Sequence, residues 1–211
     1  MPRPSRWPEI LRAASEEFRE KGYENATLEG IGARVGILKG SIYNYVGSKE
    51  ELLLAVVEQP ARALLSELDK LRADTQSSVT TRLQELVRMQ VRIFSEWYPA
   101  AFVYLRHIGH VENSPRFAEF REMDAQYMAA VEGLLAEGAA TGEFSLASDP
   151  RTVARLIVGM LDWMQHWFTP RGEEADRALA DEVFAMALGG LIAGGSMRAM
   201  LASRARGAGA P

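Results

Sequence analysis

Apolar residues recur three and four positions apart along most of the chain, which is the spacing of amphipathic helices. A first helix is predicted from Pro8 to Lys21, with Gly22 as a left-handed stop. The same spacing predicts further helices over residues 28–35, 39–46, 49–71, 79–98, 100–108, 115–140, 150–169 and 175–192. No segment alternates with a period of two, so the sequence predicts an all-α fold with about nine helices.

Several helix ends carry their own sequence signals. Thr27 is a suitable N-cap for the second helix, and Gly36 is its expected stop. Asn113-Ser114-Pro115 and Asp149-Pro150 each combine a capping side chain with a proline in the first turn, which is typical of a helix start. Pro60 lies inside the fourth helix, where the loss of one backbone donor predicts a kink.

Two short helices joined by a glycine-containing turn, residues 28–35 and 39–46, have the pattern of a helix-turn-helix. The segment from Ala26 to Leu52, ATLEGIGARVGILKGSIYNYVGSKEEL, closely resembles the DNA-binding domain of TetR-family repressors. The resemblance implies a DNA-binding domain of residues 1–51. It also implies a variable helical domain, residues 52–202, that binds a ligand and forms a homodimer through its last two helices. Residues 203–211, small and basic, are expected to be a flexible tail.

On this reading, Lys39 and Lys49 begin two successive helices and neutralise DNA phosphates. Ser41 and Asn44 face the bases of the major groove, where asparagine can pair with adenine. The predicted DNA-binding residues are Thr27, Leu38, Lys39, Gly40, Ser41, Tyr43, Asn44, Tyr45 and Lys49. Arg3 and Arg6 precede the first helix and are expected to reach a neighbouring phosphate or the minor groove.

The sequence departs from the family pattern at four positions in this segment, namely Gly32, Val35, Leu38 and Val46. Serine or threonine commonly caps the recognition helix where this chain has Leu38, so the resemblance leaves that cap and the first base contact open. The other three are small or apolar replacements.

The charge of the chain restricts how it can bind DNA. Its formal net charge is −4, which excludes binding through bulk electrostatic attraction. Between Thr27 and Lys49 there are three cations, Arg34, Lys39 and Lys49, and one acid, Glu29, so this segment carries a net charge of +2. The chain has no cysteine, which excludes disulfides, thiolate nucleophiles and cysteine-ligated metals.

A second resemblance concerns the stretch LDWMQHWFTPRG at residues 161–172, where two tryptophans are four apart. It is similar to a tryptophan-rich helix in the branch of TetR relatives that senses acyl-coenzyme A thioesters and controls fatty-acid or aromatic-acid catabolism. The residues expected to bind such a ligand are Arg92, Phe102, Arg106, Met123, Tyr127, Met160, Trp163, Met164 and Trp167. Most of these side chains also fit an ordinary helical core. A drug-like amphipathic effector, which would make the chain a repressor of an efflux pump, is the alternative.

Other classes of protein have weaker support. We expect no enzyme, because no nucleophile elbow, phosphate loop, ligand cluster or paired carboxylates are recognisable. His107 and His110 are three apart near Glu112, but a metal site there is disfavoured. No leader or membrane-spanning segment is recognisable, so a cytoplasmic location is expected.

The sequence therefore predicts a ligand-responsive repressor that binds a palindromic operator on double-stranded DNA as a dimer and is released by a small effector, without a further cofactor. The apolar residues expected to form the dimer face are Leu156, Met160, Trp163, Phe184, Leu188 and Leu191.

Overall fold

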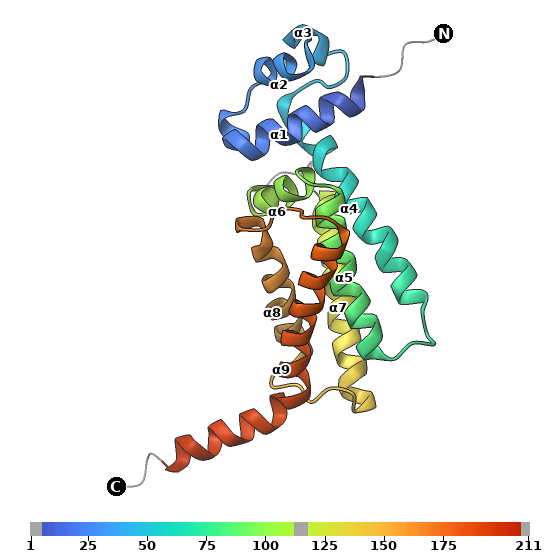
Figure 1. The fold of residues 1–211 in the computed structure, drawn as a ribbon, viewed down its shortest axis with the longest axis vertical. Coiled ribbons are helices and arrows are strands. Elements are labelled where there is room, and N and C mark those ends of the chain that lie inside the picture. Colours follow the sequence, from blue (N-terminus) through green and yellow to red (C-terminus); the bar gives the residue numbers. More distant parts are fainter. Residues whose placement is uncertain (1–5, 112–117, 208–211) are drawn as a thin grey trace. The chain divides into compact units, whose positions relative to one another are not determined.

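The computed structural model describes the backbone of residues 6–111 and 118–207, and the side chains of residues 6–106 and 118–193. Over these residues the chain is helical, with nine α-helices, one 3-10 turn and no strand (Figure 1). The predicted all-α fold is confirmed. The elements are α1 (Trp7–Asn25), α2 (Leu28–Val35), α3 (Lys39–Ile42), α4 (Lys49–Ala73), α5 (Val79–Glu96), α6 (Ala100–Val111), α7 (Ala118–Thr141), α8 (Pro150–Asp162), η2 (Trp163–His166) and α9 (Glu173–Gly207).

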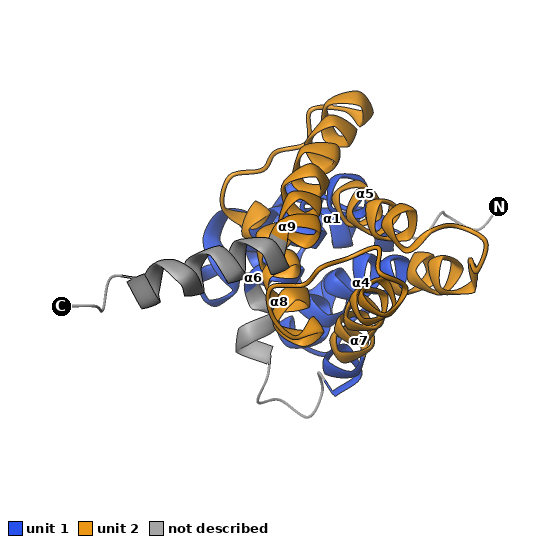
Figure 2. Cartoon of the chain, turned by 90° about the horizontal axis from the view of Figure 1, so that it is seen from below, with its two compact units in different colours: residues 1–64, 93–122 blue, residues 65–92, 123–211 orange. Residues whose placement is uncertain are grey.

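The chain divides into two compact units, coloured separately in Figure 2. Unit 1 comprises residues 1–64 and 93–122, and unit 2 comprises residues 65–92 and 123–211. Residues 52–64 and 93–122 thus belong by their packing with the first three helices. The predicted functional division between residues 51 and 52 stays a prediction.

In unit 1, α1 packs against both α2 and α6, and α2 packs against α3. Phe18 of α1, Ile31 of α2 and Ile42 of α3 are fully buried where these helices meet, so one small core fixes the angles between them. The backbone of Gly22 adopts the left-handed conformation, with φ of 74°, inside the bounds of α1. The predicted stop after Lys21 is therefore confirmed as a break, and a single further turn follows it.

Unit 2 is a bundle in which α8 and α9 lie side by side (Figures 1 and 2). Arg88 of α5 donates to Oδ1 of Asp181 on α9 at 2.7 Å and thereby joins these two helices. The predicted start of α8 is confirmed, because Oδ1 of Asp149 accepts from the backbone N–H of Thr152 at 3.0 Å and Pro150 follows the cap. The buried side chains that fill this unit include Leu83, Leu86, Val131, Leu135, Ile157, Leu161 and Met164.

Several helix ends differ from the predictions. Helix α3 ends at Ile42 rather than Val46, because the N–H of Tyr45 bonds to the carbonyl of Ile42, three residues back, and tightens the chain into a turn. Helix α8 ends at Asp162, and the 3-10 turn η2 follows it directly. The prediction had placed one helix over residues 150–169. Helix α4 continues through Pro60 to Ala73, close to its predicted end, and the kink expected at this proline stays a prediction.

At the carboxyl end, α9 continues to Gly207, beyond the predicted end at residue 192 and into the segment predicted as a tail. The start signal at residues 113–115 lies outside the described residues, as do residues 208–211. Within the described part of the chain, no helix has the length and apolar character needed to cross a membrane.

Candidate functional site

The turn between α2 and α3 is held by caps at both ends of α2. Oγ1 of Thr27 accepts a hydrogen bond from the backbone N–H of Gly30 at 3.0 Å, which confirms the predicted N-cap. Gly36 closes the helix with φ of 67°, and its N–H bonds to the carbonyl of Ala33. The next residue, Ile37, donates its N–H to the carbonyl of Gly32 at 2.9 Å. The start of α3 is therefore fixed by backbone contacts to α2.

Helix α3 buries Ile42 completely and leaves its other side chains exposed or half-buried. Leu38 precedes it without a side-chain cap and is 81% exposed, so the structure answers the doubt raised by the sequence: this helix has no capping side chain. The predicted contact residues gathered on α3 and in the turn after it are Lys39, Gly40, Ser41, Tyr43, Asn44 and Tyr45. All are exposed except Ser41, which is half-buried.

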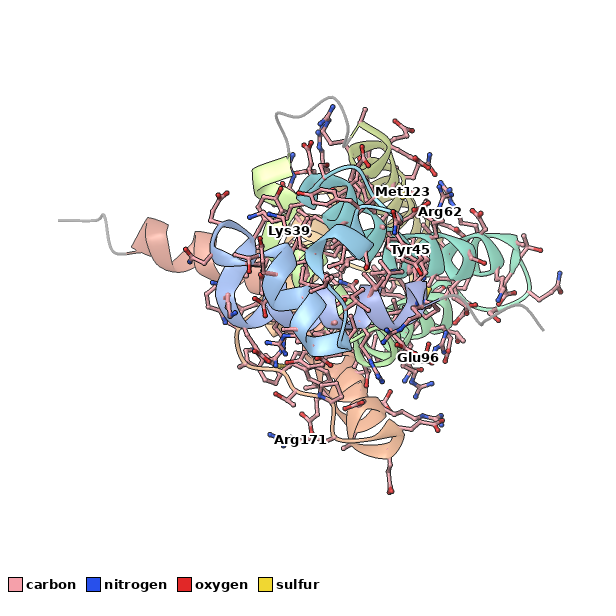
Figure 3. The ribbon with its side chains drawn as sticks, turned by 90° about the horizontal axis from the view of Figure 1, so that it is seen from above. Lys39, Tyr45, Arg62, Glu96, Met123 and Arg171 are labelled. Carbon is pink, nitrogen blue, oxygen red and sulfur yellow. The ribbon has the colours of Figure 1, made fainter. Side chains whose placement is uncertain are left out.

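Two of these side chains already have partners inside unit 1. Nζ of Lys39 lies 2.8 Å from Oε1 of Glu29 on α2, and this hydrogen bond raises the pKa of the lysine and lowers that of the glutamate. The ring of Tyr45 is stacked on that of Trp7 at the start of α1, with centroids 5.7 Å apart and planes 4° from parallel. Figure 3 labels both Lys39 and Tyr45. A phosphate contact by Lys39, which would have to replace this carboxylate, stays a prediction.

Lys49 has a different environment from the one predicted. Its ammonium donates to the carbonyls of Tyr23, Glu24 and Ala26 at 2.8, 3.2 and 3.1 Å, and lies 4.5 Å from the centre of the Tyr23 ring. These carbonyls follow the break in α1 at Gly22, so the lysine supplies the donors that the interrupted helix lacks. The three donors of the ammonium are engaged in this way, and a phosphate contact by Lys49 stays a prediction.

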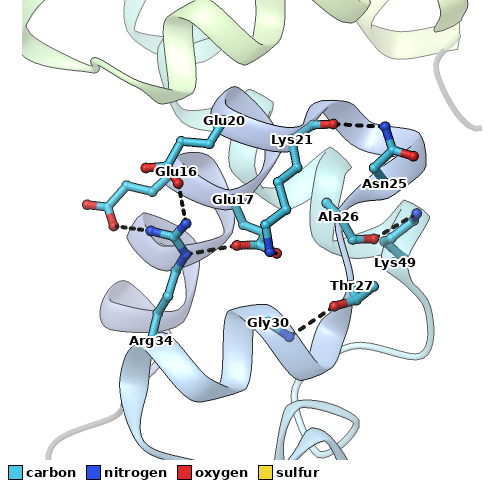
Figure 4. A network of polar contacts seen from close by, with 10 residues as sticks. All are labelled: Glu16, Glu17, Glu20, Lys21, Asn25, Ala26, Thr27, Gly30, Arg34 and Lys49. Atoms are coloured by element: carbon cyan, nitrogen blue, oxygen red, sulfur yellow. Dashed lines mark hydrogen bonds and ion pairs between the residues drawn. The ribbon is translucent and has the colours of Figure 1, made fainter.

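Arg34, counted in the net charge of the helix-turn-helix segment, and Arg6, expected to reach DNA, both have internal partners. The guanidinium of Arg34 contacts three carboxylates of α1 (Figure 4). Arg6 donates to the backbone carbonyl of Val35 at 2.5 Å and to Glu9 at 3.1 Å, so it joins the start of α1 to the end of α2. Arg3 lies outside the described residues. The carboxylates that surround Arg34 belong to Glu16, Glu17 and Glu20, at 3.5, 2.9 and 2.5 Å.

Glu17 is the buried centre of this network, with 1% of its side chain exposed. Burial raises the pKa of its carboxyl, but hydrogen bonds from Lys21 at 2.6 Å and Arg34 at 2.9 Å outweigh that effect, and the net shift is downward. The carboxylate is therefore charged and paired at neutral pH. It ties α2 to α1.

Two glycines of α2 allow these close contacts. A β-carbon at Gly30 would lie 2.3 Å from Oε1 of Glu17, and one at Gly32 would lie 2.6 Å from the backbone carbonyl of Ile37. This close approach to Ile37 explains why the chain has glycine at position 32, where it departs from the family pattern. The role of Glu17 was missed, because a glutamate at a helical position reads as a solvent-exposed residue until the partner helix is present.

Two sequence profiles match the chain. "Bacterial regulatory proteins, tetR family" matches residues 10–56, and "Tetracyclin repressor-like, C-terminal domain" matches residues 76–191, which is more than half of the chain. The chain belongs to the TetR family. This family is one of regulatory DNA-binding proteins, so helices α2 and α3 of this TetR-family chain are its helix-turn-helix.

Known TetR-family proteins resemble the chain over most of its length. The HTH-type transcriptional repressor KstR2 of Rhodococcus jostii is 26% identical over 186 residues, which are 87% of this chain and 89% of that protein. A solved structure of the ketosteroid transcriptional regulator KstR2 of Mycobacterium tuberculosis has a TM-score of 0.82 at 25% identity, covering 90% of this chain and 96% of that one. The structure of AibR in complex with isovaleryl coenzyme A and operator DNA has a TM-score of 0.73 at 22% identity, covering 86% and 97%.

The residues predicted to bind an effector fall into both units of this TetR-family chain. Phe102 and Arg106 belong to unit 1, where the guanidinium of Arg106 lies 5.8 Å from the centre of the Phe102 ring. Three of the others are each buried in unit 2, namely Met123 and Tyr127 on α7 and Met164 in η2.

The remaining predicted residues lie at the surface of unit 2. Arg92 is exposed and pairs with Glu67 at 3.0 Å. Trp163 and Trp167 are 61% and 54% exposed, and because α8 ends before them they do not share one face of an α-helix as predicted. Met160 is exposed as well. Ligand binding by these side chains stays a prediction.

One carboxyl group inside unit 2 was not singled out in the sequence. Burial, together with the charge of Asp124, raises the pKa of Asp162 to about 7, and a hydrogen bond from Gln90 only partly opposes this. A carboxyl so close to its titration point at neutral pH can either donate or accept a hydrogen bond. No sequence signal marked it, because it is the last residue of a helix otherwise read by its apolar face.

Of the apolar residues predicted to form the dimer face, some are buried within unit 2 and others are exposed. Phe184 and Leu191 are buried within unit 2 itself and Leu188 is half-buried. Exposed apolar side chains remain at Leu156, Met160 and Trp163 along α8 and η2, and at Met186 and Ile192 on α9.

Proposed function

We propose that this chain is a transcriptional repressor that binds a palindromic operator as a two-fold dimer and is released by an acyl-coenzyme A thioester. The observation that carries the DNA-binding part is the set of exposed polar and aromatic side chains on α3, held in place by capped and buried contacts behind them. In this proposal Ser41 and Asn44 contact bases, and Lys39 contacts a phosphate after leaving Glu29. The proposed contact residues also include Thr27, Leu38, Gly40, Tyr43 and Tyr45.

Lys49 has another role in the proposal. It positions the helix-turn-helix by binding the end of α1 after its break at Gly22, through the carbonyls of Tyr23, Glu24 and Ala26. The charge offered to DNA by residues 27–49 is then smaller than the sequence count of +2, because Arg34 is surrounded by acids as well. A helix-turn-helix of such low charge needs the second copy in a dimer to bind operator DNA tightly.

The exposed apolar side chains of α8, η2 and α9 support the dimer. Leu156 is 64% exposed and Trp163 is 61% exposed, in a chain that buries most of its large apolar residues. Large apolar groups clustered on adjacent helices are typical of a protein interface. A two-fold axis at this face would place two recognition helices on one palindrome.

Two observations support an acyl-coenzyme A thioester as the effector. A structure with the same fold is described as a complex with isovaleryl coenzyme A and operator DNA. In this chain, Met123, Tyr127 and Met164 are all buried in unit 2, and methionine side chains adapt their shape to a flexible apolar chain. The ligand would act by binding the DNA-free state more tightly than the DNA-bound state.

The proposal is tested with a duplex taken from the promoter of the chain's own gene. Lys39→Ala combined with Asn44→Ala should weaken binding at least about 100-fold, from the loss of one phosphate contact and one base contact in each subunit. Arg62→Ala is the matched control, since it removes an exposed cation of the same unit that pairs with Glu58 and Glu119. Equal binding by the double variant and the wild type would refute the proposal that Lys39 and Asn44 contact the DNA.

The effector is tested by adding short-chain, long-chain and aromatic acyl-coenzyme A esters to the complex. Release by at least one class below millimolar concentration is expected. If none of them releases the duplex, the effector is of another class, such as a drug-like amphipathic molecule.

A further inference from the structure

Three polar side chains are hydrogen-bonded in series across three helices of unit 2. Tyr127 of α7, 4% exposed, donates its hydroxyl hydrogen to Oε1 of Gln90 on α5. Nε2 of Gln90 donates in turn to Oδ1 of Asp162 at the end of α8, at 3.4 Å. We call Gln90, Tyr127 and Asp162 the polar relay.

Within the polar relay Tyr127 is buried, whereas Gln90 and Asp162 are half-buried, with apolar residues next to them in the sequence. Met123 precedes Tyr127 by one turn of α7, and Met164 follows Asp162 by two residues, and both methionines are buried. Polar groups in such an interior reduce stability unless each has a good partner, at a cost of about 1–3 kcal/mol for an unmatched group. The hydrogen bond from Gln90 to Asp162 is long, at 3.4 Å. Among the described side chains, Gln90 is the one that donates to this carboxyl. The relay therefore ends in a carboxyl group with capacity for a further partner.

The direction of the hydrogen bonds indicates which partner fits. Tyr127 donates a hydrogen bond to Gln90, and Gln90 donates one to Asp162, so an ionised Asp162 can only accept. In its neutral form, which burial favours, the same carboxyl can donate. A hydroxyl group fits both forms, because it can donate to the carboxylate and accept from the carboxylic acid. A carbonyl oxygen fits only the neutral form.

We propose that the polar relay recognises a hydroxyl group on the otherwise apolar body of the effector, with Asp162 in direct contact and Gln90 and Tyr127 positioning it. This inference rests on the proposed function, since it narrows the acyl-coenzyme A class to esters whose acyl chain is hydroxylated. The buried methionines then contact the hydrocarbon part of the chain, and the relay supplies the one polar contact along it. Such a site discriminates between effectors, because one without the hydroxyl would displace water from the half-buried carboxyl and leave it unmatched.

The test compares matched esters on the full chain bound to its promoter duplex. Decanoyl-coenzyme A is compared with its 3-hydroxy and 10-hydroxy derivatives, and release is followed by fluorescence polarisation. We expect at least one hydroxylated ester to release the duplex at a concentration about tenfold lower than decanoyl-coenzyme A, which corresponds to about 1.4 kcal/mol. In Gln90→Leu and Asp162→Leu this preference should fall below about threefold.

Two further variants separate recognition from folding. Asp162→Asn keeps the shape and a hydrogen-bonding side chain, so it should fold and retain part of the preference. Gln84→Leu is the matched control on α5, where the glutamine contacts Asp181 instead of the relay, and its preference should equal that of the wild type. Each variant is first shown to bind the duplex with wild-type affinity, which checks that it is folded.

The outcomes separate this inference from the proposed function. Equal potency of saturated and hydroxylated esters on the wild type would overturn the role of the relay and leave the effector class intact. A preference that survives in both Gln90→Leu and Asp162→Leu would overturn it as well. If no ester of either kind releases the duplex, the proposed effector class fails and the inference fails with it.

Discussion

A β-carbon on Gly30 would lie 2.3 Å from Oε1 of Glu17, closer than two such atoms can approach. The carboxylate cannot easily move away, because Lys21 and Arg34 hold it from two sides and it is buried. The crossing of α1 and α2 therefore depends on the absence of one methyl group. This relationship sets the position of the recognition helix from behind.

The variant Gly30→Ala should lower the free energy of unfolding by about 1–3 kcal/mol, despite the better helix propensity of alanine, because the methyl group overpacks a buried ion pair. The measurement is the melting temperature followed by circular dichroism. Gly40→Ala is the control, since a β-carbon there meets nothing within 4 Å. Similar melting of the two variants would show that Glu17 moves at little cost.

The two lysines of the helix-turn-helix region should separate into a DNA contact and a structural contact. Lys39→Met should reduce the slope of log K against log salt concentration by about 0.9 for each head, as expected for one lost phosphate contact, and leave the melting temperature unchanged. Lys49→Met should leave that slope unchanged and lower stability by about 1–3 kcal/mol, because three backbone carbonyls lose their donor. The reverse pattern would assign the phosphate contact to Lys49.

Asp162 should make stability depend on pH in a definite direction. Its pKa is raised from the ordinary value of 3.8 to about 7, so between these pH values the folded chain keeps a proton that the unfolded chain has released. The stability that comes from the neutral carboxyl is fully present below about pH 4 and is lost as the pH rises through about 7. In Asp162→Asn this loss is absent.

The measurement is the difference in unfolding free energy between wild type and Asp162→Asn at several pH values. Going from pH 4 to pH 8, the wild type should lose up to about 4 kcal/mol relative to the variant. A difference that is constant over this range would show that Asp162 titrates near its ordinary value.

The exposed face of α8 gives a test of assembly. Leu156→Asp places a charge among Met160 and Trp163 and should shift the chain towards the monomer in sedimentation experiments, with a loss of operator affinity that follows the loss of dimer. Arg151→Asp on the same helix introduces the same acid away from this apolar group and should leave the dimer intact. An unchanged dimer in Leu156→Asp would place the interface elsewhere.

The sequence predicted the helices well because their signals are local. Thr27, Gly36 and Asp149 act within three or four residues of their own position, so their roles could be read without knowing the tertiary structure. The end of α8 before Trp163 had no such signal, because the apolar spacing continues through the 3-10 turn.

The roles of charged residues were harder to predict, since they depend on which helix lies opposite. In the sequence, Arg34 and Lys49 cannot be distinguished from the cations of a DNA-binding segment that contact phosphates. In the fold, one faces three acids of α1 and the other faces the carbonyls after Gly22. Asp162 was missed for the same reason, because its partner Gln90 lies 72 residues away along the chain.

The clamp of Arg34 by glutamates of α1 has a consequence for how the protein searches a genome. A DNA-binding domain whose cations are mostly paired with its own carboxylates binds unrelated DNA weakly at physiological salt. This is because non-specific binding depends on cations that release counterions from the DNA phosphates. Such a protein spends little time on each wrong site and reaches its operator by frequent dissociation and rebinding rather than by long sliding.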